Sequence, residues 1–288
     1  MNKKMEASEL VLNEDGSVYH LHLKPEHIAD DIIIVGDQDR VKEVSRHFDS
    51  IEFKTNKREF VTHTGYIGKK RLTVLSTGIG TDNIDIVFNE LDALVNIDLE
   101  TRLAKTSLKS LNIIRIGTSG SLQKDIPIDS ILLSSHGLGL DGLMNFYQVM
   151  NTAEEEEILK KINTQVELPL TPSLTAASQD LLNLFKGEDL HYGITLTSTG
   201  FYGPQGRTLR LKPSIDNFIE DLSKLHFGAH RVTNLEMETS GIYGLGRLLG
   251  HKCLSVNAIL ANRQALTFSK DSKAIVEKAI LLTLEKLA

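Results

Sequence analysis

The chain of 288 residues contains a single cysteine, Cys253. One thiol cannot form a disulfide within the chain, so a disulfide-stapled scaffold is excluded and a reducing compartment is favoured. The first 17 residues, MNKKMEASELVLNEDGS, lack the apolar core of a signal peptide, and no stretch approaches a membrane span. We therefore expect a soluble, cytoplasmic protein with no membrane partner.

The sequence also lacks an excess of positive charge. Its net charge is −6 and its isoelectric point is about 5.9. These values exclude binding to nucleic acid or to a membrane through bulk charge. An anionic substrate must instead meet positive charge that is concentrated at one place.

Common metal and nucleotide motifs are missing as well. The chain has no HExxH or CxxC pattern, its ten histidines are scattered, and it has neither a Walker A loop nor a Gly-x-Ser-x-Gly elbow. Gly78 and Gly80 begin a dinucleotide-binding pattern, but Asn83 stands where the third glycine belongs. We therefore predict no metal ion and no dinucleotide.

What the chain does contain is an alternation of apolar strands and helical patterns, with 41% hydrophobic residues and no repeat or linker. This alternation predicts one α/β domain, in which helices cover both sides of a parallel or mixed sheet. The predicted strands span residues 31–36, 72–80, 111–117, 130–135, 191–199 and 252–261. The predicted helices span residues 83–97, 153–163, 174–186, 213–225, 237–249 and 272–287. Ligands bind such folds at the carboxyl ends of the strands.

The first predicted strand ends in VGDQDR, residues 35–40. Its glycine turn lets an anion approach backbone N–H groups, and Arg40 adds a charge that can bind bidentately. An ordinary turn with a solvated arginine is an alternative interpretation of the same segment.

The third strand leads into RIGTSG, which places Arg115 between two isoleucines. A buried arginine needs a partner. That partner is either a carboxylate or an oxyanion that Arg115 binds together with the Thr118 hydroxyl group. The later segment NLEMETS is ambiguous in a similar way, because Glu236 and Glu238 either cap a helix or hold vicinal hydroxyl groups beside Met237.

The segment STGFYGPQGR, residues 198–207, reads as a loop after a strand, since its glycines and proline exclude a helix interior. The loop combines an aromatic ring, Phe201, with a planar amide, Gln205, and a guanidinium, Arg207. A turn with solvated polar groups does not explain why these complementary groups occur together.

Taken in order, these motifs resemble those of the nucleoside phosphorylase superfamily, and in particular those of the uridine phosphorylases. The matching segments are VYHLHL (18–23), VGDQDRV (35–41), KREFVTHTG (57–65), STGIG (76–80), RIGTSGSL (115–122), FYGPQGR (201–207), NLEMETS (234–240) and LANR (260–263). The resemblance begins near residue 18, so we divide the chain into an N-terminal extension, residues 1–17, and a nucleoside phosphorylase domain, residues 18–288.

The resemblance implies a mixed, distorted central sheet surrounded by helices. It also implies phosphorolysis of uridine to uracil and ribose 1-phosphate in pyrimidine salvage, with 2′-deoxyuridine as a further candidate substrate. The only co-substrate implied is inorganic phosphate, and no cofactor is implied.

The resemblance also assigns roles to individual residues. The implied phosphate-binding residues are Gly36, Arg40, Arg58, Arg115 and Thr118. The implied base-binding residues are Phe201, Gln205 and Arg207, and the implied ribose-binding residues are His20, Met237 and Glu238. Arg207, Gln205, Arg115 and Glu238 are the implied catalytic residues. The base assignment is chemically reasonable, because uracil presents O2, N3–H and O4 along one edge, which an amide and a guanidinium can match.

In the family, the arginine at the position of Arg58 reaches the phosphate of the neighbouring subunit. The histidine at the position of His20 likewise reaches the neighbour's ribose 5′-OH. We therefore expect a homodimer or a ring of dimers with shared active sites.

Some features depart from the family or stay unassigned. Gln38 replaces a proline found in many bacterial members, and Gly203-Pro204 reverses their Pro-Gly order. The segment 134–150 has no assigned role. Some bacterial relatives hold a monovalent cation through a glutamate at the position of Glu59. The sequence leaves open whether Glu59 of this chain does the same.

Three alternatives remain. Purine phosphorylases place an acidic proton donor near the LANR position, where this chain has Ala261 and Asn262, so purine cleavage is disfavoured. Nucleosidases use water and do not need Arg40, Arg58 and Arg115. A non-catalytic nucleoside-binding protein would keep the same uracil recognition.

Overall fold

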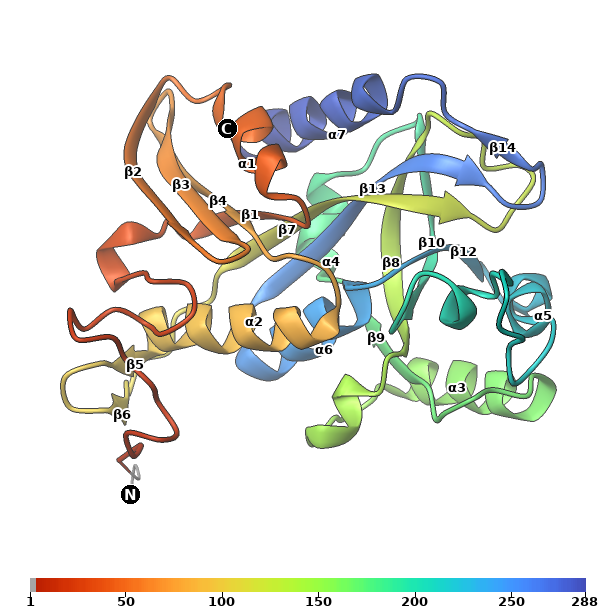
Figure 1. The fold of residues 1–288 in the computed structure, drawn as a ribbon, viewed down its shortest axis with the longest axis horizontal. Helices are drawn as coiled ribbons and strands as arrows, with labels where there is room; N and C mark the ends of the chain where they lie inside the picture. Colours follow the sequence, from red (N-terminus) through yellow and green to blue (C-terminus); the bar gives the residue numbers. More distant parts are fainter. Residues whose placement is uncertain (1–3) are drawn as a thin grey trace.

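A large mixed β-sheet organises the chain in a computed structural model that describes residues 4–288 (Figure 1). Its strands are β1 (Asp31–Val35), β2 (Ser50–Lys57), β3 (Phe60–Ile67), β4 (Lys70–Ser76), β7 (Asn112–Ser121), β8 (Ile131–Leu140), β9 (Ser173–Ala176), β10 (Leu190–Ser198), β11 (His226–Phe227), β12 (His230–Glu236), β13 (Lys252–Asn262) and β14 (Thr267–Phe268). Their order is β11-β12-β10-β8-β13-β7-β1-β4-β3-β2, with β9 beside β8 and β14 beside β13. Two further short strands, β5 (Ile97–Asp98) and β6 (Leu103–Ala104), form a separate antiparallel pair.

The sheet closes on itself over part of its width. β1 runs parallel to β4 and β7, and β7 runs parallel to β13, whereas β13 and β8 are antiparallel. β12 pairs with β10 on one side and antiparallel with β7 on the other, where Leu235 lies opposite Gly120. Strands β7, β13, β8, β10 and β12 therefore form a closed ring. This closure brings the residues after Leu235 to the carboxyl end of β7.

Helices cover both sides of the sheet. They are α1 (Gln38–Ser45), α2 (Thr81–Asn96), α3 (Ala153–Gln165), α4 (Gln179–Leu184), α5 (Phe218–Lys224), α6 (Thr239–Leu249) and α7 (Ser272–Leu287), with 3-10 turns η1 (Pro25–His27), η2 (Leu143–Phe146) and η3 (Gly203–Gln205). Helices α1 and α7 lie above the sheet in the view of Figure 1, and α2 and α6 lie below it. Val41 and Ile280 fill the core on the first side, and Phe88 and Ile242 fill the core on the second. The predicted α/β domain with a mixed, distorted sheet is confirmed.

Several predicted elements are wrong in their type or extent. The helix expected over 174–186 begins as strand β9, because residues 173–176 pair with β8, and only Gln179–Leu184 are helical. The helix expected over 213–225 starts at Phe218, since Asn217 before it has a left-handed backbone with φ of 63°. The strand expected over 72–80 ends at Ser76, and positive φ values at Gly78 and Gly80 turn the chain into α2.

The segment before residue 18 packs against the domain from residue 4 onward. The backbone N–H of Met5 donates to the Arg102 carbonyl (3.0 Å), and Arg102 Nη1 donates to the Leu10 carbonyl (2.6 Å). The Leu10 side chain is buried. Within residues 4–288, no helix is both long enough and apolar enough to cross a membrane.

Candidate active site

Three strand ends meet at the edge of the sheet where the phosphate motifs were predicted. In the parallel register Val35 of β1 lies beside Ile116 of β7 and Ser76 of β4, so Gly36, Gly117 and the turn at Gly78 follow at the same level. A Cβ atom on Gly36 would lie 3.5 Å from the Gly78 carbonyl oxygen. The first strand, the third strand and the STGIG turn are therefore brought together.

Arg40 follows the glycine turn at the end of β1 and lies close enough to Arg115 for the two charges to interact. It lies in the first turn of α1, which Asp37 caps by accepting from the Asp39 N–H (2.9 Å). The Arg40 Nε atom is buried and has no hydrogen-bond partner among residues 4–288. Burial, and next the positive charge of Arg115, lower the pKa of Arg40. Two guanidinium groups thus act on one site, which is an environment that favours an anion.

Arg115 is buried and paired with two carboxylates. Its Nη2 atom donates to Glu238 and lies 3.2 Å from Glu236 Oε2, while its Nη1 atom donates to Asn257 Oδ1 (3.3 Å). Burial acts to lower the pKa of Arg115, but the two glutamates outweigh it and raise the pKa. The carboxylate partner anticipated for a buried arginine is present. Gly117 is needed here, because a Cβ atom at that position would lie 1.8 Å from Arg115 Nη1.

The two glutamates of the NLEMETS segment have different hydrogen-bond partners. Glu236 accepts from the N–H groups of Glu238 (3.0 Å) and Thr239 (3.0 and 3.1 Å), so it caps the start of α6. Glu238 turns toward the site, where one oxygen accepts from Arg115 and the other from the Gly80 N–H (2.9 Å). Met237 between them is partly exposed. The capping role is therefore found on Glu236, and the binding of vicinal hydroxyl groups by Glu238 stays a prediction.

The loop after β10 gathers its polar groups around one aromatic ring. The Arg207 guanidinium stacks on Phe201, with Cζ 3.9 Å from the ring centroid, and donates to the Phe201 carbonyl (2.6 Å) and to Gln205 Oε1. The Gln205 side chain is buried, whereas that of Phe201 is 51% exposed. Gly206 has φ of 66°, which turns the backbone between Gln205 and Arg207. Arg207 thus contacts both of the other groups singled out in the sequence, Phe201 and Gln205.

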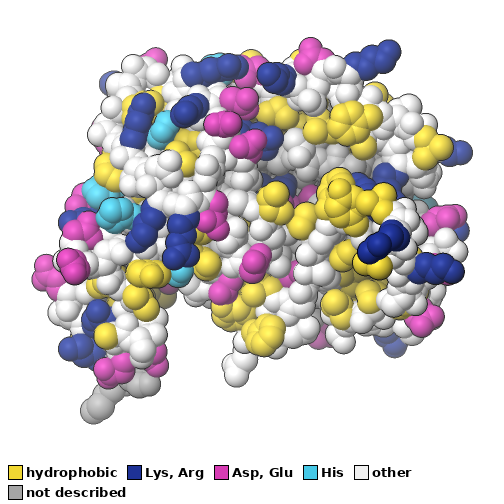
Figure 2. Space-filling view, in the orientation of Figure 1, with side chains coloured by type: hydrophobic (Ala, Val, Ile, Leu, Met, Phe, Trp, Pro, Cys, Tyr) yellow, Lys and Arg dark blue, Asp and Glu magenta, His cyan; other side chains and the backbone are white. Residues whose placement is uncertain are grey.

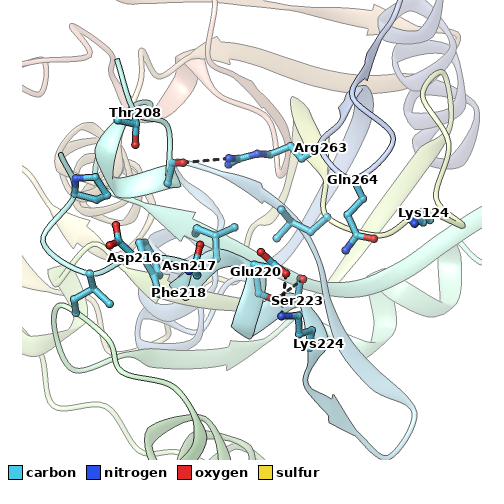
Figure 3. A pocket seen from close by; sticks show the side chains of 15 residues that line it. Lys124, Thr208, Asp216, Asn217, Phe218, Glu220, Ser223, Lys224, Arg263 and Gln264 are labelled. Carbon is cyan, nitrogen blue, oxygen red and sulfur yellow. Dashed lines mark hydrogen bonds and ion pairs between the residues drawn. The ribbon is translucent and has the colours of Figure 1, made fainter. Parts of the chain in front are cut away.

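Arg263 ties this loop to the sheet, a role that the sequence analysis missed. It follows β13 and donates to the carbonyl groups of Gln205 and Gly206 (3.4 Å for the second). Figure 3 shows the Arg263 side chain reaching the loop beside a cavity of about 690 Å³, which is also lined by Lys124, Asn217 and Phe218. Burial lowers the pKa of Arg207, and the charge of Arg263 lowers it further. Positive charge is therefore concentrated at the loop of residues 198–207, in a chain whose net charge is negative.

Two predicted residues lie away from this cluster. His20 binds Glu90 in the middle of α2, with 2.7 Å between Nδ1 and Oε1. Arg58 is exposed in the β2–β3 turn with φ of 56°, and its carbonyl accepts from Gln38 Nε2 (2.7 Å). Neither side chain contacts the Arg115–Glu238 pair within the described part of the chain.

Asn262 and the segment 134–150 both have structural roles. Asn262 is buried and fully bonded, because its amide group donates to the carbonyls of Gln123 and Ile126 (both 2.8 Å) and its oxygen accepts from two backbone N–H groups. The segment 134–150 forms most of β8 and the η2 turn, and Asp141 within it accepts from Ser240 at the start of α6 (2.6 Å).

Comparisons with known proteins agree with this architecture. A family model described as "Phosphorylase superfamily" matches residues 30–286. A uridine phosphorylase of Thermococcus kodakarensis is 29% identical over 278 residues, which cover 94% of this chain and 86% of the relative. A purine nucleoside phosphorylase of the DeoD type from Streptococcus suis is 26% identical over 248 residues, covering 83% of this chain and 84% of the relative.

A solved structure gives the same result in three dimensions. The nucleoside phosphorylase of Trypanosoma brucei, described as showing uridine phosphorylase activity, superposes with a TM-score of 0.89 at 30% identity and covers 96% of this chain and 99% of that one. Together with the family match and the motifs in their predicted order, this confirms that the chain belongs to the phosphorylase superfamily.

Proposed function

We propose that this protein is a pentosyltransferase that cleaves uridine with inorganic phosphate, giving uracil and ribose 1-phosphate. The similarity to the Trypanosoma nucleoside phosphorylase, described as showing uridine phosphorylase activity, and to the Thermococcus uridine phosphorylase supports this proposal. The observation that carries it is the buried Arg40 Nε atom, which has no hydrogen-bond partner among residues 4–288 and lies close to the charge of Arg115. A bound anion supplies the acceptor that this guanidinium lacks.

Phosphate occupies the position between Arg40, Arg115, Gly36 and Thr118 in this proposal. Because these groups lie at the carboxyl ends of parallel strands, backbone N–H groups and guanidinium donors converge on one side of the substrate. Phosphate then serves as the nucleophile for the ribose C1′ and as a counter-charge to the positive charge that develops there.

Glu238 fixes the ribose in the proposed complex. Its two oxygens are already oriented by Arg115 and by the Gly80 N–H, and each oxygen keeps a further lone pair for a 2′-OH or 3′-OH donor. The partly exposed Met237 packs against the same sugar. Orientation by groups that are already in place reduces the entropy lost on reaching the transition state.

The leaving uracil receives the negative charge of the broken bond. Gln205 and Arg207 donate to its edge, and these hydrogen bonds strengthen as the ring becomes anionic, which is preferential binding of the transition state. Phe201 offers an exposed ring face for stacking, worth roughly 0.5–1.5 kcal/mol beyond its buried area.

Pyrimidines fit these groups better than purines do. A purine leaving group is protonated at N7, and the saturated hydrogen bonds of Asn262 leave no acid at the end of β13. Arg263 is a cation with a reference pKa above about 12, so it is not a proton donor either. Cytosine presents an amino donor where uracil presents O4, and so it faces the Arg207 donor unfavourably.

The smallest active assembly in this proposal is a dimer in the cytoplasm. His20 and Arg58 do not reach the site of their own chain, and they are available to the site of a neighbour. Exposed apolar side chains also gather over the right side of the molecule in Figure 2. Leu209 and Leu211 are among the most exposed apolar residues, at 77% and 79%. Contact with a second copy is a ready way to cover such surface.

The decisive experiment is the absorbance change of uridine mixed with the protein, with and without phosphate. Conversion that requires phosphate is expected. Conversion without phosphate would identify a nucleosidase, and binding without conversion a nucleoside-binding protein.

Shared sites are tested by mixing two variants. Arg58→Ala and Arg207→Ala proteins are each expected to be nearly inactive. A mixed dimer rebuilds one intact site, so activity should partly return after subunit exchange. No recovery once exchange has been verified by mass spectrometry would contradict a role for Arg58 in the neighbouring site.

A further inference from the structure

Glu90, in the middle of α2, binds the segment that carries His20. Its carboxylate accepts from the His20 N–H (2.9 and 3.0 Å to the two oxygens), from the Leu21 N–H (2.8 Å) and from His20 Nδ1 (2.7 Å). The Glu90 side chain is 15% exposed. A single carboxylate thus fixes both the backbone and the imidazole ring, across 70 residues of sequence.

These contacts determine which nitrogen of His20 carries a proton. A carboxylate can only accept, so Nδ1 is the protonated nitrogen, and in the neutral ring Nε2 is an acceptor. No residue from 4 to 288 lies within hydrogen-bond distance of Nε2, and the His20 side chain is 29% exposed. The Tyr19 ring packs edge-on at 4.8 Å and limits rotation of the imidazole.

The acceptor makes no contact with the site of its own chain among the described residues. Gly80, whose N–H binds Glu238, precedes the first residue of α2, and Glu90 lies ten residues later. At 1.5 Å per residue this corresponds to about 15 Å along the helix axis, which separates His20 from the Arg115–Glu238 pair.

Lys57 holds the same segment against the Arg58 turn. Its Nζ atom donates to the Tyr19 carbonyl (2.5 Å) and to Asn13 Oδ1 (3.0 Å), and lies 4.8 Å from the Tyr19 ring centroid. The segment that carries His20 is therefore held beside the β2–β3 turn that carries Arg58.

We propose that Glu90 is a positioning residue, which holds His20 as the Nδ1–H tautomer so that Nε2 accepts a hydrogen bond from the ribose 5′-OH bound in the partner subunit. This inference rests on the proposed phosphorolysis of uridine by a dimer. Glu90 itself does not touch the substrate and acts only through the imidazole.

The test compares uridine with 5′-deoxyuridine, which lacks the hydroxyl group in question. Glu90→Gln keeps the size of the side chain but removes the carboxylate. We expect kcat/KM for uridine to fall about tenfold, the effect of losing one hydrogen bond of roughly 1.4 kcal/mol, and kcat/KM for 5′-deoxyuridine to stay unchanged. His20→Ala should give the same split, and the double variant should lose no more than either single variant.

Glu156→Gln, at an exposed glutamate of α3, is the control and should leave kcat/KM unchanged for both substrates. Nitrogen-15 NMR of His20 gives a readout that is independent of turnover: wild type should show the Nδ1–H tautomer and Glu90→Gln a mixture. Equal losses for both substrates, or unchanged kinetics in Glu90→Gln, would overturn the proposal. Absence of uridine cleavage by the wild type would instead remove the proposed function, while the NMR result would still decide whether Glu90 sets the tautomer.

Discussion

Replacing Arg40 with methionine should stabilise the fold and at the same time weaken phosphate binding. The buried Nε atom lacks a partner among the described residues, and the guanidinium is repelled by Arg115. An unsatisfied buried polar group costs roughly 1–3 kcal/mol, so Arg40→Met should raise the free energy of unfolding by about 1 kcal/mol. For a domain of this size, that corresponds to an increase of roughly 2–4 °C in Tm.

The opposite effect is expected with phosphate. One charge-assisted hydrogen bond contributes roughly 1.5–3 kcal/mol, so KM for phosphate should rise about 10- to 150-fold. Thermal unfolding with and without phosphate measures both effects together, because saturation at 100 times Kd stabilises the wild type by about 2.7 kcal/mol. At the same phosphate concentration this stabilisation should fall to about 0.3–1.4 kcal/mol in Arg40→Met.

The matched control is Arg46→Met at the other end of α1. Arg46 is exposed and bonds Glu277 (2.5 Å), and such surface pairs contribute about 0–1 kcal/mol. It should therefore change neither Tm nor KM for phosphate substantially. If Arg40→Met lowered Tm and left phosphate affinity intact, Arg40 would be a structural residue and the argument for an anion site would fail.

Three other predictions concern the base, the substrate and pH. Arg207→Ala should lower kcat/KM for uridine, because roughly 2–4 kcal/mol of transition-state stabilisation is lost, and it should weaken phosphate binding less. Unchanged uridine kinetics would exclude base binding by this residue. In a panel at fixed phosphate, uridine should surpass cytidine, inosine and adenosine in kcat/KM, and faster cleavage of a purine would reverse the assignment. Burial, then the charge of His230, lowers the pKa of His136 from 6.5 to about 4. The unfolded chain therefore binds a proton first as pH falls, and stability is lost between about pH 6.5 and 4. In His136→Gln the free energy of unfolding should therefore depend less steeply on pH over this range. The same slope in the variant and the wild type would contradict this prediction.

The sequence predicted the central strands well, because they are continuous apolar runs. It did not predict β2 and β3, since β2 alternates exposed and partly buried residues and contains several charges. It also missed β12, whose HRVTNLE sequence is buried through pairing with β10 and β7 and not through apolar composition. The ring closure that pairs Leu235 with Gly120 joins residues more than 100 positions apart, and no local pattern encodes it.

The site was only partly accessible to sequence reasoning. Polar side chains in apolar or glycine-rich surroundings, such as Arg115 and Gln205, stand out in the sequence and were recognised as candidate site residues. Asn257 and Glu90 could have been noticed as polar residues in an apolar strand and in a helix, but their roles depend on which distant residue they meet. The split of functions between Glu236 and Glu238 likewise required coordinates, because both lie beside the same helix start.

The closed ring of strands has a consequence for how activity arises during folding. The Arg115–Glu238 contact spans 123 residues and the Gly80–Glu238 contact spans 158. Contacts between residues so far apart in the sequence form late, after local helices and hairpins. The entropy cost of closing a long loop must be met before such a contact can stabilise the fold. The groups proposed to bind phosphate and ribose therefore become adjacent only when the ring is complete. Recovery of activity after dilution from denaturant should lag behind recovery of helical circular dichroism, which makes turnover a reporter of the last folding step.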